Sequence, residues 1–390
     1  MQRPGSRGLA ALLLTLWLPA LARAALAADL PAPLPEEEAQ VLSLPAPDGE
    51  RLYVTDVAFP HMVDGRVHVL DGHTGHYLGV IDSGYSALGV PSADGLHYYL
   101  ATTYYDRLTH GNRTDVVEIH DARTLALEAE VVIPSKHAQA IPYRGMIAAT
   151  ADGNFLLVQN GTPASSVSVV DLRSRKFVGE IQTPGCWSVQ PWPQAPRFST
   201  LCGDGTLLTV TLDDTGQAAS RTRSARFFDP DKDPLFIHPE SNGSRRYFVS
   251  YLGDVYGIDL SGELPSFETA WPLLSASERK QGWRPGGFEL TAVHHDSGTL
   301  FVAMHDRGHD GSHKDPAKEV WALDLATHHR SARIPARGTV SLAASQGAQA
   351  RLYLLDIEKA TITVHAIGKG FKSVGSFAGV GDTAMFMELR

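Results

Sequence analysis

The sequence predicts an all-β protein, a seven-bladed β-propeller of four-stranded antiparallel blades. Short β-rich runs alternate with Gly, Asp and Asn turns from residue 51 onward, and long amphipathic helix patterns are nearly absent. An apolar strand followed by Asp and a turn recurs at intervals of 50, 50, 42, 46, 65 and 42 residues. A period of about 40–50 residues with several strands in each period is typical of a propeller. The Asp positions are 71, 121, 171, 213, 259 and 324, and a degenerate seventh copy ends near Ala366.

A partner strand precedes most of these Asp strands. The partners are expected at RLYVTD (51–56), HYYLATT (97–103), NFLLVQN (154–160), RRYFVSY (245–251), TLFVAMH (299–305) and RLYLLD (351–356). Asp-Gly pairs at 48–49, 71–72, 94–95, 152–153 and 204–205 supply the positive φ angles that tight hairpins need. A two-sheet sandwich is the main alternative, but the stretch from 51 to 390 is too long for one sandwich at this period.

The 65-residue interval contains an insertion, LLSASERKQGWRPGG. Ser275 or Ser277 is expected to cap a short helix there, since serine hydroxyls accept hydrogen bonds from the first free N–H groups of a helix. The helix should stop before Pro285 and Gly286.

The N-terminus has the pattern of a secretory signal peptide. Arg3 and Arg7 precede an apolar run of fourteen residues, Leu9 to Ala22, and small-residue cleavage patterns follow. We expect a signal peptide over residues 1–27, cleaved after Ala24 or Ala27. A membrane anchor is the alternative, but the run falls short of the roughly 20 residues that cross a bilayer. Residues 28–50, rich in Pro and Glu, are expected to form an extended arm before a propeller at 51–390.

The composition excludes several classes of protein. The net charge is −9, and the loss of residues 1–27, with three arginines and no acid, changes it to −12. An acidic surface does not suit nucleic-acid binding, because phosphate contacts need basic side chains. Two cysteines are too few for a four-thiolate zinc or iron–sulfur site.

The two cysteines, Cys186 and Cys202, have fifteen residues between them. In an exported protein they are expected to form a structural disulfide between adjacent strands of one blade, because disulfides persist outside the cytosol. The alternative is a redox-active pair, which would favour C-x-x-C spacing and a site that stabilises a thiolate.

The densest polar segment contains His305, His309 and His313 at four-residue steps. This spacing would suit a metal site on a helix, but the intervening glycines predict a loop with solvated or backbone-bonded histidines. G-x-S-x-G, P-loop and H-E-x-x-H motifs are absent from the sequence. We therefore expect no metal site and no catalytic residues in this chain.

Several long strings, in one order, resemble the heavy chain of the periplasmic quinoprotein amine dehydrogenases. The likeness runs from about residue 50 to the C-terminus, and it looks closest to the aralkylamine (aromatic amine) dehydrogenase heavy chain. The methylamine dehydrogenase heavy chain shares W-R-P-G-G and looks more distant. The strings are TTYYDRLTHGNRTDVVEIHDARTL, GCWSV with CGDGTLLTV, DKDPLFIHPE, YFVSYLGDVYGIDLSG, GWRPGG and GSHKDPAKEVWALD.

The resemblance implies a heavy subunit in a heterotetramer of two heavy and two light chains, located in the periplasm. It implies no cofactor in this chain, because the family's light chain carries tryptophan tryptophylquinone, made from two of its own tryptophans. Such an enzyme converts a primary amine to an aldehyde and ammonia, and passes electrons to a blue copper protein of the azurin or amicyanin type.

The resemblance also implies one substrate-channel residue. In the family an aromatic residue, commonly Phe, lines the channel, and the matching position in IDSGYSALGV is Tyr85. Its alternative is an ordinary hairpin tyrosine packed against a blade edge. Two other functions remain as alternatives: a methylamine dehydrogenase heavy chain, and a free-standing periplasmic propeller that binds a ligand or hydrolyses a lactone.

Overall fold

The computed structural model describes residues 42–139, 142–368 and 370–389. The expected signal peptide, both of its cleavage positions and the arm as far as residue 41 lie outside these residues. Ser43–Arg390 form one compact unit. Among the described residues, no helix combines the length and apolar character that crossing a bilayer requires.

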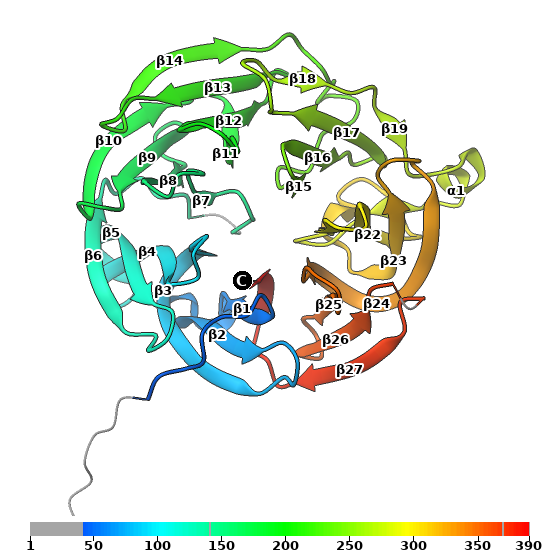
Figure 1. The fold of residues 1–390 in the computed structure, drawn as a ribbon, viewed down its shortest axis with the longest axis horizontal. Coiled ribbons are helices and arrows are strands. Elements are labelled where there is room, and N and C mark those ends of the chain that lie inside the picture. Colours follow the sequence, from blue (N-terminus) through cyan, green and yellow to red (C-terminus); the bar gives the residue numbers. More distant parts are fainter. Residues whose placement is uncertain (1–41, 140–141, 369, 390) are drawn as a thin grey trace, which may run out of the picture. The chain divides into compact units, whose positions relative to one another are not determined.

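The fold is all-β, as the sequence predicts, and consists of antiparallel sheets grouped around a central axis like the blades of a propeller (Figure 1). All six partner strands expected from the sequence are present. The first sheet has the order β28-β1-β2-β3-β4-β5-β6. Its strands are β28 (Ala384–Leu389), β1 (Arg51–Asp56), β2 (Gly65–Asp71), β3 (Tyr77–Pro91), β4 (His97–Arg107), β5 (His110–Asp121) and β6 (Leu127–Ile133).

In each of the next three sheets the chain runs from an innermost strand near the axis to an outermost strand (Figure 1). The second has the order β10-β9-β8-β7, the third β11-β12-β13-β14, and the fourth β15-β16-β17-β18 with β19 paired to β17. Their strands are β7 (Ile147–Ala149), β8 (Phe155–Asn160), β9 (Ser166–Asp171), β10 (Lys176–Gln182), β11 (Cys186–Pro191), β12 (Arg197–Cys202), β13 (Leu207–Leu212), β14 (Ala218–Arg223), β15 (Glu240–Asn242), β16 (Arg245–Val249), β17 (Asp254–Asp259), β18 (Ser266–Phe267) and β19 (Trp271–Pro272).

The last sheet has the order β20-β22-β23-β24-β25-β26-β27, with β21 paired to β22. Like β3, its strand β24 is fifteen residues long and pairs with different strands at its two ends. The strands are β20 (Arg284–Pro285), β21 (Thr291–His294), β22 (Thr299–His305), β23 (Ala317–Asp324), β24 (Arg330–Ala344), β25 (Arg351–Asp356), β26 (Thr361–Ala366) and β27 (Ser373–Ala378).

The recurring Asp residues end strands and hold the turns that follow. Asp71 Oδ1 accepts hydrogen bonds from the backbone N–H groups of His73 at 2.8 Å and Thr74 at 3.0 Å. Burial opposes the ionisation of Asp71, but these donors outweigh it and hold the carboxyl pKa below its usual value. The same type of turn follows Asp121, Asp171, Asp213, Asp259 and Asp324. The period in the sequence therefore reflects a turn that is repeated along the chain, in which an Asp side chain accepts hydrogen bonds from the backbone.

The Asp-Gly prediction holds at four of its five positions. Gly49, Gly95, Gly153 and Gly205 have positive φ angles, as expected. At 71–72 the prediction is wrong, because the positive φ in that turn belongs to Gly75. A Cβ on Gly72 would lie 2.2 Å from the carbonyl oxygen of Glu50, so close backbone approach explains this glycine.

The predicted short helix is α1 (Ala276–Lys280), and Ser275 is its cap. Ser275 Oγ accepts from the backbone N–H of Glu278, and the Glu278 carboxylate accepts from the backbone N–H of Ser275, which makes a capping box. Glu278 also binds Arg330 on β24 at 2.7 Å. Two 3₁₀ segments, η1 (Phe59–Asp64) and η2 (Ser312–Lys314), complete the described helical elements.

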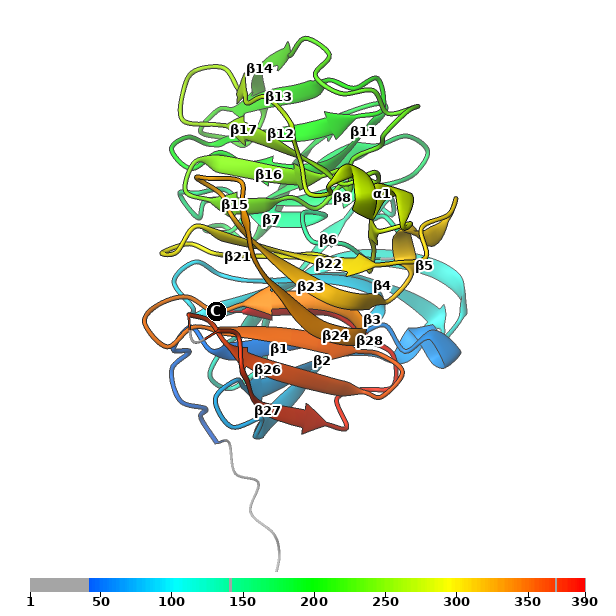
Figure 2. The ribbon, with the colours of Figure 1, turned by 90° about the vertical axis from the view of Figure 1, so that its right-hand side faces the viewer.

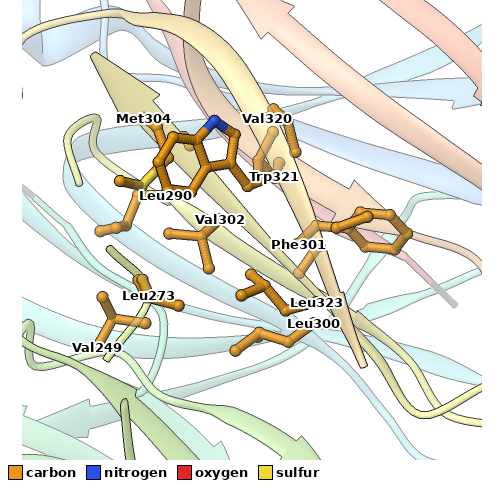
Figure 3. Packing of buried hydrophobic residues seen from close by; sticks show 14 of the residues in the cluster. Val249, Leu273, Leu290, Leu300, Phe301, Val302, Met304, Val320, Trp321 and Leu323 are labelled. Carbon is orange, nitrogen blue, oxygen red and sulfur yellow. The ribbon is translucent and has the colours of Figure 1, made fainter. Parts of the chain in front are cut away.

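The largest apolar cluster packs β22 and β23 against neighbouring sheets. Figure 3 shows part of it, with Trp321, Met304 and Val302 close together. Trp321 and Val302 are fully buried. Consecutive apolar residues of the TLFVAMH and VWALD strings supply this cluster, because both faces of these strands are buried.

Candidate functional site

One end of the compact unit carries most of the irregular structure. Figure 2 shows α1, the β4–β5 hairpin and the loop between β22 and β23 on its right-hand side, together with the blue segment that contains η1. We call this end the helix face. The turns made by the recurring Asp residues lie at the opposite end, because the Asp-ending strands run away from the helix face.

Tyr85 lies within β3 at a bend that turns toward β4. The pairing register shifts between Tyr85 and Leu88, and both neighbours of Tyr85 have positive φ angles, +58° at Gly84 and +56° at Ser86. A Cβ on Gly84 would lie 2.8 Å from Cε1 of Tyr104, so glycine is needed there for space as well. The bend leaves the Tyr85 side chain half-buried.

A second tyrosine stands beside Tyr85. The ring of Tyr105 on β4 meets that of Tyr85 edge to face, with centroids 6.0 Å apart and planes at 84°. Gln139 donates a hydrogen bond to the Tyr105 hydroxyl at 3.2 Å. We call these two rings the aromatic wall. Tyr85 was singled out from the sequence, whereas Tyr105 was not. Edge-to-face pairs of this kind are stabilising and leave ring faces free for another aromatic group.

Tyr104 on β4 lies next to the same bend, beside Gly84. Its hydroxyl donates to Glu118 Oε1 at 2.7 Å, and His120 Nε2 lies 2.9 Å from Glu118 Oε2. Burial, reinforced by the Glu118 carboxylate, raises the pKa of Tyr104 far above its usual value. Tyr104 therefore remains a neutral hydrogen-bond donor that fixes the backbone around Gly84.

A buried ion pair holds the segment that carries Gln139. The Asp115 carboxylate, fully buried on β5, accepts from Arg113 Nε and Nη2 at 2.7 Å each. It also accepts from Thr103 Oγ1 at 2.9 Å and from the backbone N–H of His137 at 2.7 Å. Arg113 in turn donates to the His137 carbonyl at 2.8 Å. The pair thus ties the chain at residue 137 to β4 and β5.

The helix face also exposes apolar surface. Phe59 in η1 is 43% exposed and Leu108 at the β4–β5 turn is 77% exposed. A hollow of about 450 Å3 is lined mainly by Leu235, Phe236 and Tyr251. Exposed large apolar side chains and an apolar hollow at one end of a protein are typical of a surface that another protein covers.

The three histidines of the polar loop do not converge. His305 is buried at the end of β22, His309 is exposed and lies 2.8 Å from the carbonyl of Arg307, and His313 is in η2. Within the described ranges, no group of three His, Cys, Asp or Glu side chains is arranged to hold a metal ion. The expectation of backbone-bonded, loop histidines fits His309, whereas His305 is a core residue.

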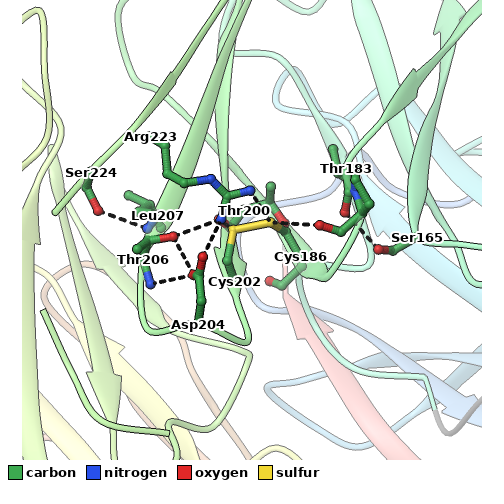
Figure 4. The surroundings of a disulfide bond; sticks show 12 residues. Ser165, Thr183, Cys186, Thr200, Cys202, Asp204, Thr206, Leu207, Arg223 and Ser224 are labelled. Carbon is green, nitrogen blue, oxygen red and sulfur yellow. Dashed lines mark hydrogen bonds and ion pairs between the residues drawn. A yellow bond between two sulfur atoms is a disulfide. The ribbon is translucent and has the colours of Figure 1, made fainter. Parts of the chain in front are cut away.

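The two cysteines are joined in a disulfide with an S–S distance of 2.06 Å (Figure 4). Cys186 on β11 and Cys202 on β12 are direct cross-strand partners, and both are buried. Arg223 on β14 lies beside the bridge, 3.7 Å from the Cys186 sulfur, and also binds Asp204. The disulfide therefore crosslinks two adjacent strands within one sheet.

Sequence reasoning missed an ionic cluster near the axis. Arg144 makes an ion pair with Glu240 on β15 and one with Glu388 on β28 at 3.2 Å, and its backbone N–H donates to Glu289 Oε1 at 2.5 Å. The cluster joins residues 96 to 244 positions apart in the chain. The four residues are far apart in the chain and share no local motif, so the sequence could not indicate that they meet.

Burial controls the charges of this cluster. It raises the pKa of Glu240 to about 7 and also raises the pKa values of Glu289 and Glu388, while Arg144 partly opposes these shifts. Burial lowers the pKa of His238, which faces Glu289, to about 3. His238 is therefore neutral at physiological pH.

A tryptophan-derived quinone, which the family resemblance assigns to a partner chain, does not fit the tryptophan pair Trp283 and Trp321. Trp283 and Trp321 lie against each other with ring centroids 5.3 Å apart. Both are buried, and the Arg333 guanidinium lies over both rings, at 4.6 and 5.1 Å. A quinone must meet its substrate, and these rings are closed off from one.

A family model described as methylamine dehydrogenase heavy chain matches residues 48–386. The methylamine dehydrogenase heavy chain of Paracoccus versutus is 30% identical over 345 residues, covering 87% of this chain and 79% of that protein. The heavy chain from Methylorubrum extorquens is 30% identical over 340 residues, covering 86% of this chain and 81% of that protein.

Solved structures with low sequence identity share the fold. The β-propeller domain of Cps50 (Swd1) from Myceliophthora thermophila has a TM-score of 0.52 at 9% identity, covering 86% of this chain and 95% of that one. Dihydro-heme d1 dehydrogenase NirN has a TM-score of 0.53 at 18% identity, covering 91% of this chain and 77% of that one. These likenesses support the propeller architecture alone.

Proposed function

Because this chain belongs to the methylamine dehydrogenase heavy chain family, we propose that it is the heavy subunit of a periplasmic aralkylamine dehydrogenase. The observation that carries the proposal is the family match over residues 48–386, together with the aromatic wall of Tyr85 and Tyr105. An aromatic wall suits substrates that themselves carry an aromatic ring, since ring–ring contacts add stabilisation beyond area burial.

The proposed enzyme contains two heavy and two light chains. The light chain's tryptophan tryptophylquinone supplies the oxidising chemistry, and a blue copper protein of the azurin or amicyanin type accepts the electrons. The overall reaction converts a primary amine and water to an aldehyde and ammonia, and releases two protons and two electrons. The heavy chain binds no cofactor in this proposal.

The role of this chain is to bind the light chain and shape the approach to its quinone. The helix face suits that task because it combines exposed Phe59 and Leu108 with the apolar hollow at Tyr251. Covering such a surface removes apolar area from water. Tyr85 and Tyr105 would then border the channel, orient the aromatic ring of the amine and exclude water.

The proposal also includes the expected N-terminal segments. Residues 1–27 would be a signal peptide cleaved after Ala24 or Ala27, and 28–50 an arm ahead of the propeller at 51–390.

Seven blades are supported by the seven sequence repeats and by the strand pairings. β3 and β24 each end one blade and begin the next, which divides the five sheets into seven groups.

A second candidate substrate is methylamine, because the related proteins named above are methylamine dehydrogenase heavy chains. Co-expression with the light-chain gene from the same genome, followed by steady-state kinetics, separates the two. We expect a higher kcat/KM for 2-phenylethylamine and tyramine than for methylamine. The reverse order would favour methylamine, and a monomeric protein that never associates with a light chain would refute the subunit proposal.

The Tyr85→Ala variant tests the channel role. Losing the ring should lower kcat/KM for 2-phenylethylamine relative to methylamine by about threefold to tenfold, the equivalent of one aromatic contact. Tyr77→Ala, on the exposed part of the same strand, is the matched control and should leave the ratio unchanged. An unchanged ratio in Tyr85→Ala would exclude Tyr85 from the channel.

A further inference from the structure

A second cavity opens at the end opposite the helix face. We call it the axial funnel; it has a volume of about 640 Å3. It lies beside the axis, near the chain end marked C in Figure 1. β1 runs from Arg51, next to the funnel rim, to Asp56 beside η1, so the funnel mouth and the helix face lie at opposite ends of the strand. The rim includes Asp48, His295 and Gln346.

The funnel has an apolar wall and a charged floor. Small and medium apolar side chains form the wall, and Arg144, Glu240 and Glu388 form the floor. The side chains of Glu240 and Glu388 are 12% and 24% exposed, and both line the funnel. The apolar wall residues are Ala292, Val293, Ala343, Ala344, Met387 and Leu389, and Ser241 and Ser345 also line the funnel.

The floor carries surplus negative charge when its carboxyl groups are ionised, and because burial raises their pKa values, that of Glu240 to about 7, this state belongs to the higher pH range at which binding is measured. One guanidinium, that of Arg144, stands among three carboxylates, Glu240, Glu289 and Glu388, and the facing His238 is neutral. In a site of low dielectric such a surplus is costly, and a cation that neutralises it gains correspondingly.

One carboxylate oxygen of the cluster, Oε2 of Glu289, lacks a hydrogen-bond donor among the residues that the structure describes, in keeping with the excess of carboxylates over cationic groups. Glu289 is 1% exposed, and its Oε2 atom lies 3.9 Å from Arg144 Nε and 3.6 Å from Nδ1 of His238, which is also without a hydrogen-bond partner among these residues. Buried acceptors are nearly always paired with donors, so the cluster lacks donors.

An anionic occupant does not fit, because the guanidinium that lines the funnel, that of Arg144, is already paired with carboxylates. Its Nε binds Glu388, its Nη1 binds Glu240, and its Nη2 donates to the Leu342 carbonyl at 3.2 Å. A divalent metal ion does not fit either, because the described residues hold no suitable ligand group. What the funnel offers is carboxylate oxygens below an apolar wall.

We propose that the axial funnel binds a primary ammonium ion that carries a small apolar group. The ammonium group donates hydrogen bonds to Glu240 and Glu388, and the apolar group packs against Ala343, Ala344 and Met387. Charge-assisted bonds of this type are roughly twice as strong as neutral ones. The site is built from this chain alone and does not depend on the proposed light chain.

Isothermal titration calorimetry with tert-butylammonium chloride tests the proposal. This amine has no α-hydrogen, so an amine dehydrogenase cannot oxidise it. The complete heavy chain, alone and in its complex, should bind one equivalent at constant ionic strength and at a pH above the pKa of Glu240. tert-Butanol, a neutral molecule of nearly the same shape, should bind at least about tenfold more weakly. Equal binding of the two would refute a role for the carboxylates.

Two variants locate the site. Glu240→Gln removes one negative charge at constant shape and should weaken tert-butylammonium binding by about tenfold or more. Ala344→Phe fills the funnel and keeps every carboxylate, so it should abolish binding even if Glu240→Gln proves unstable. Glu128→Gln, an exposed ion-pair residue on β6, is the control and should bind normally. Unchanged binding in Ala344→Phe, or equal loss in Glu128→Gln, would overturn the proposal. The titration of the isolated heavy chain needs no light chain, so failure there leaves the proposed function untouched, and failure of the proposed function leaves that titration untouched.

Discussion

Replacing Asp115 with alanine is expected to destabilise the chain more than the loss of an exposed ion pair would. The buried carboxylate accepts hydrogen bonds from Arg113, Thr103 and the backbone of His137. Alanine would leave the Arg113 guanidinium, only 21% exposed, without its partner. Breaking a buried pair by removing one member costs about 3–5 kcal/mol, because the other charge remains uncompensated.

Urea unfolding, followed by circular dichroism and fluorescence, measures this loss. With a denaturant dependence of about 3 kcal/mol/M, the midpoint should fall by about 1–1.7 M. Asp64→Ala is the control, because Asp64 pairs with Arg66 at 2.6 Å and both are nearly half exposed. That variant should lose less than about 1 kcal/mol. If both variants shifted the midpoint equally, the buried network would not hold β5 to the segment at residue 137.

The remaining predictions concern single structural features. Replacing Cys186 and Cys202 with serine should cost about 3 kcal/mol in the chain-entropy model for a loop of this length, measured by urea unfolding with and without reductant; reductant should not affect the variant. Asp71→Ala should cost about 1 kcal/mol and Asp71→Asn less, because asparagine keeps the accepting oxygen; equal losses would contradict the turn-capping role. Ser275→Ala should cost about 1 kcal/mol by removing the cap of α1, and no change in the unfolding midpoint would speak against it. Burial raises the pKa of Glu240 from 4.5 to about 7, so the folded state holds this proton more tightly than the unfolded state, and its stabilising contribution is lost as pH rises from about 4.5 to about 7. Glu240→Gln should remove that decline from the plot of unfolding free energy against pH, and an identical plot would refute the assignment.

The sequence could predict features that depend on neighbours in the chain. The Asp turns and the capped helix use bonds between residues two to four positions apart, so their patterns are visible in the string of letters. Ser275 was one of two options for the cap, and the structure selects it. The strand positions were predictable for the same reason, since each strand alternates or concentrates apolar side chains.

Features that depend on convergence in space could not be predicted. Arg144 meets Glu240, Glu289 and Glu388 only after several sheets have assembled around the axis, and none of the four has a local signature. Gly72 shows the same limit at short range. The Asp71-Gly72 pair predicted a positive φ, but the close approach of the Glu50 carbonyl, directly before β1, explains the glycine.

The pairing of β28 with β1 has a consequence for how the protein is made. Leu389, at the end of the chain, is the register partner of Leu52, near its beginning. During synthesis from the N-terminus, this edge of β1 therefore stays unpaired until β28 has been added. Open strand edges recruit other chains, and closing so long a loop is entropically slow. A variant truncated before Ala384 would thus keep almost all of its strands but leave the β1 edge open as a permanent site for aggregation.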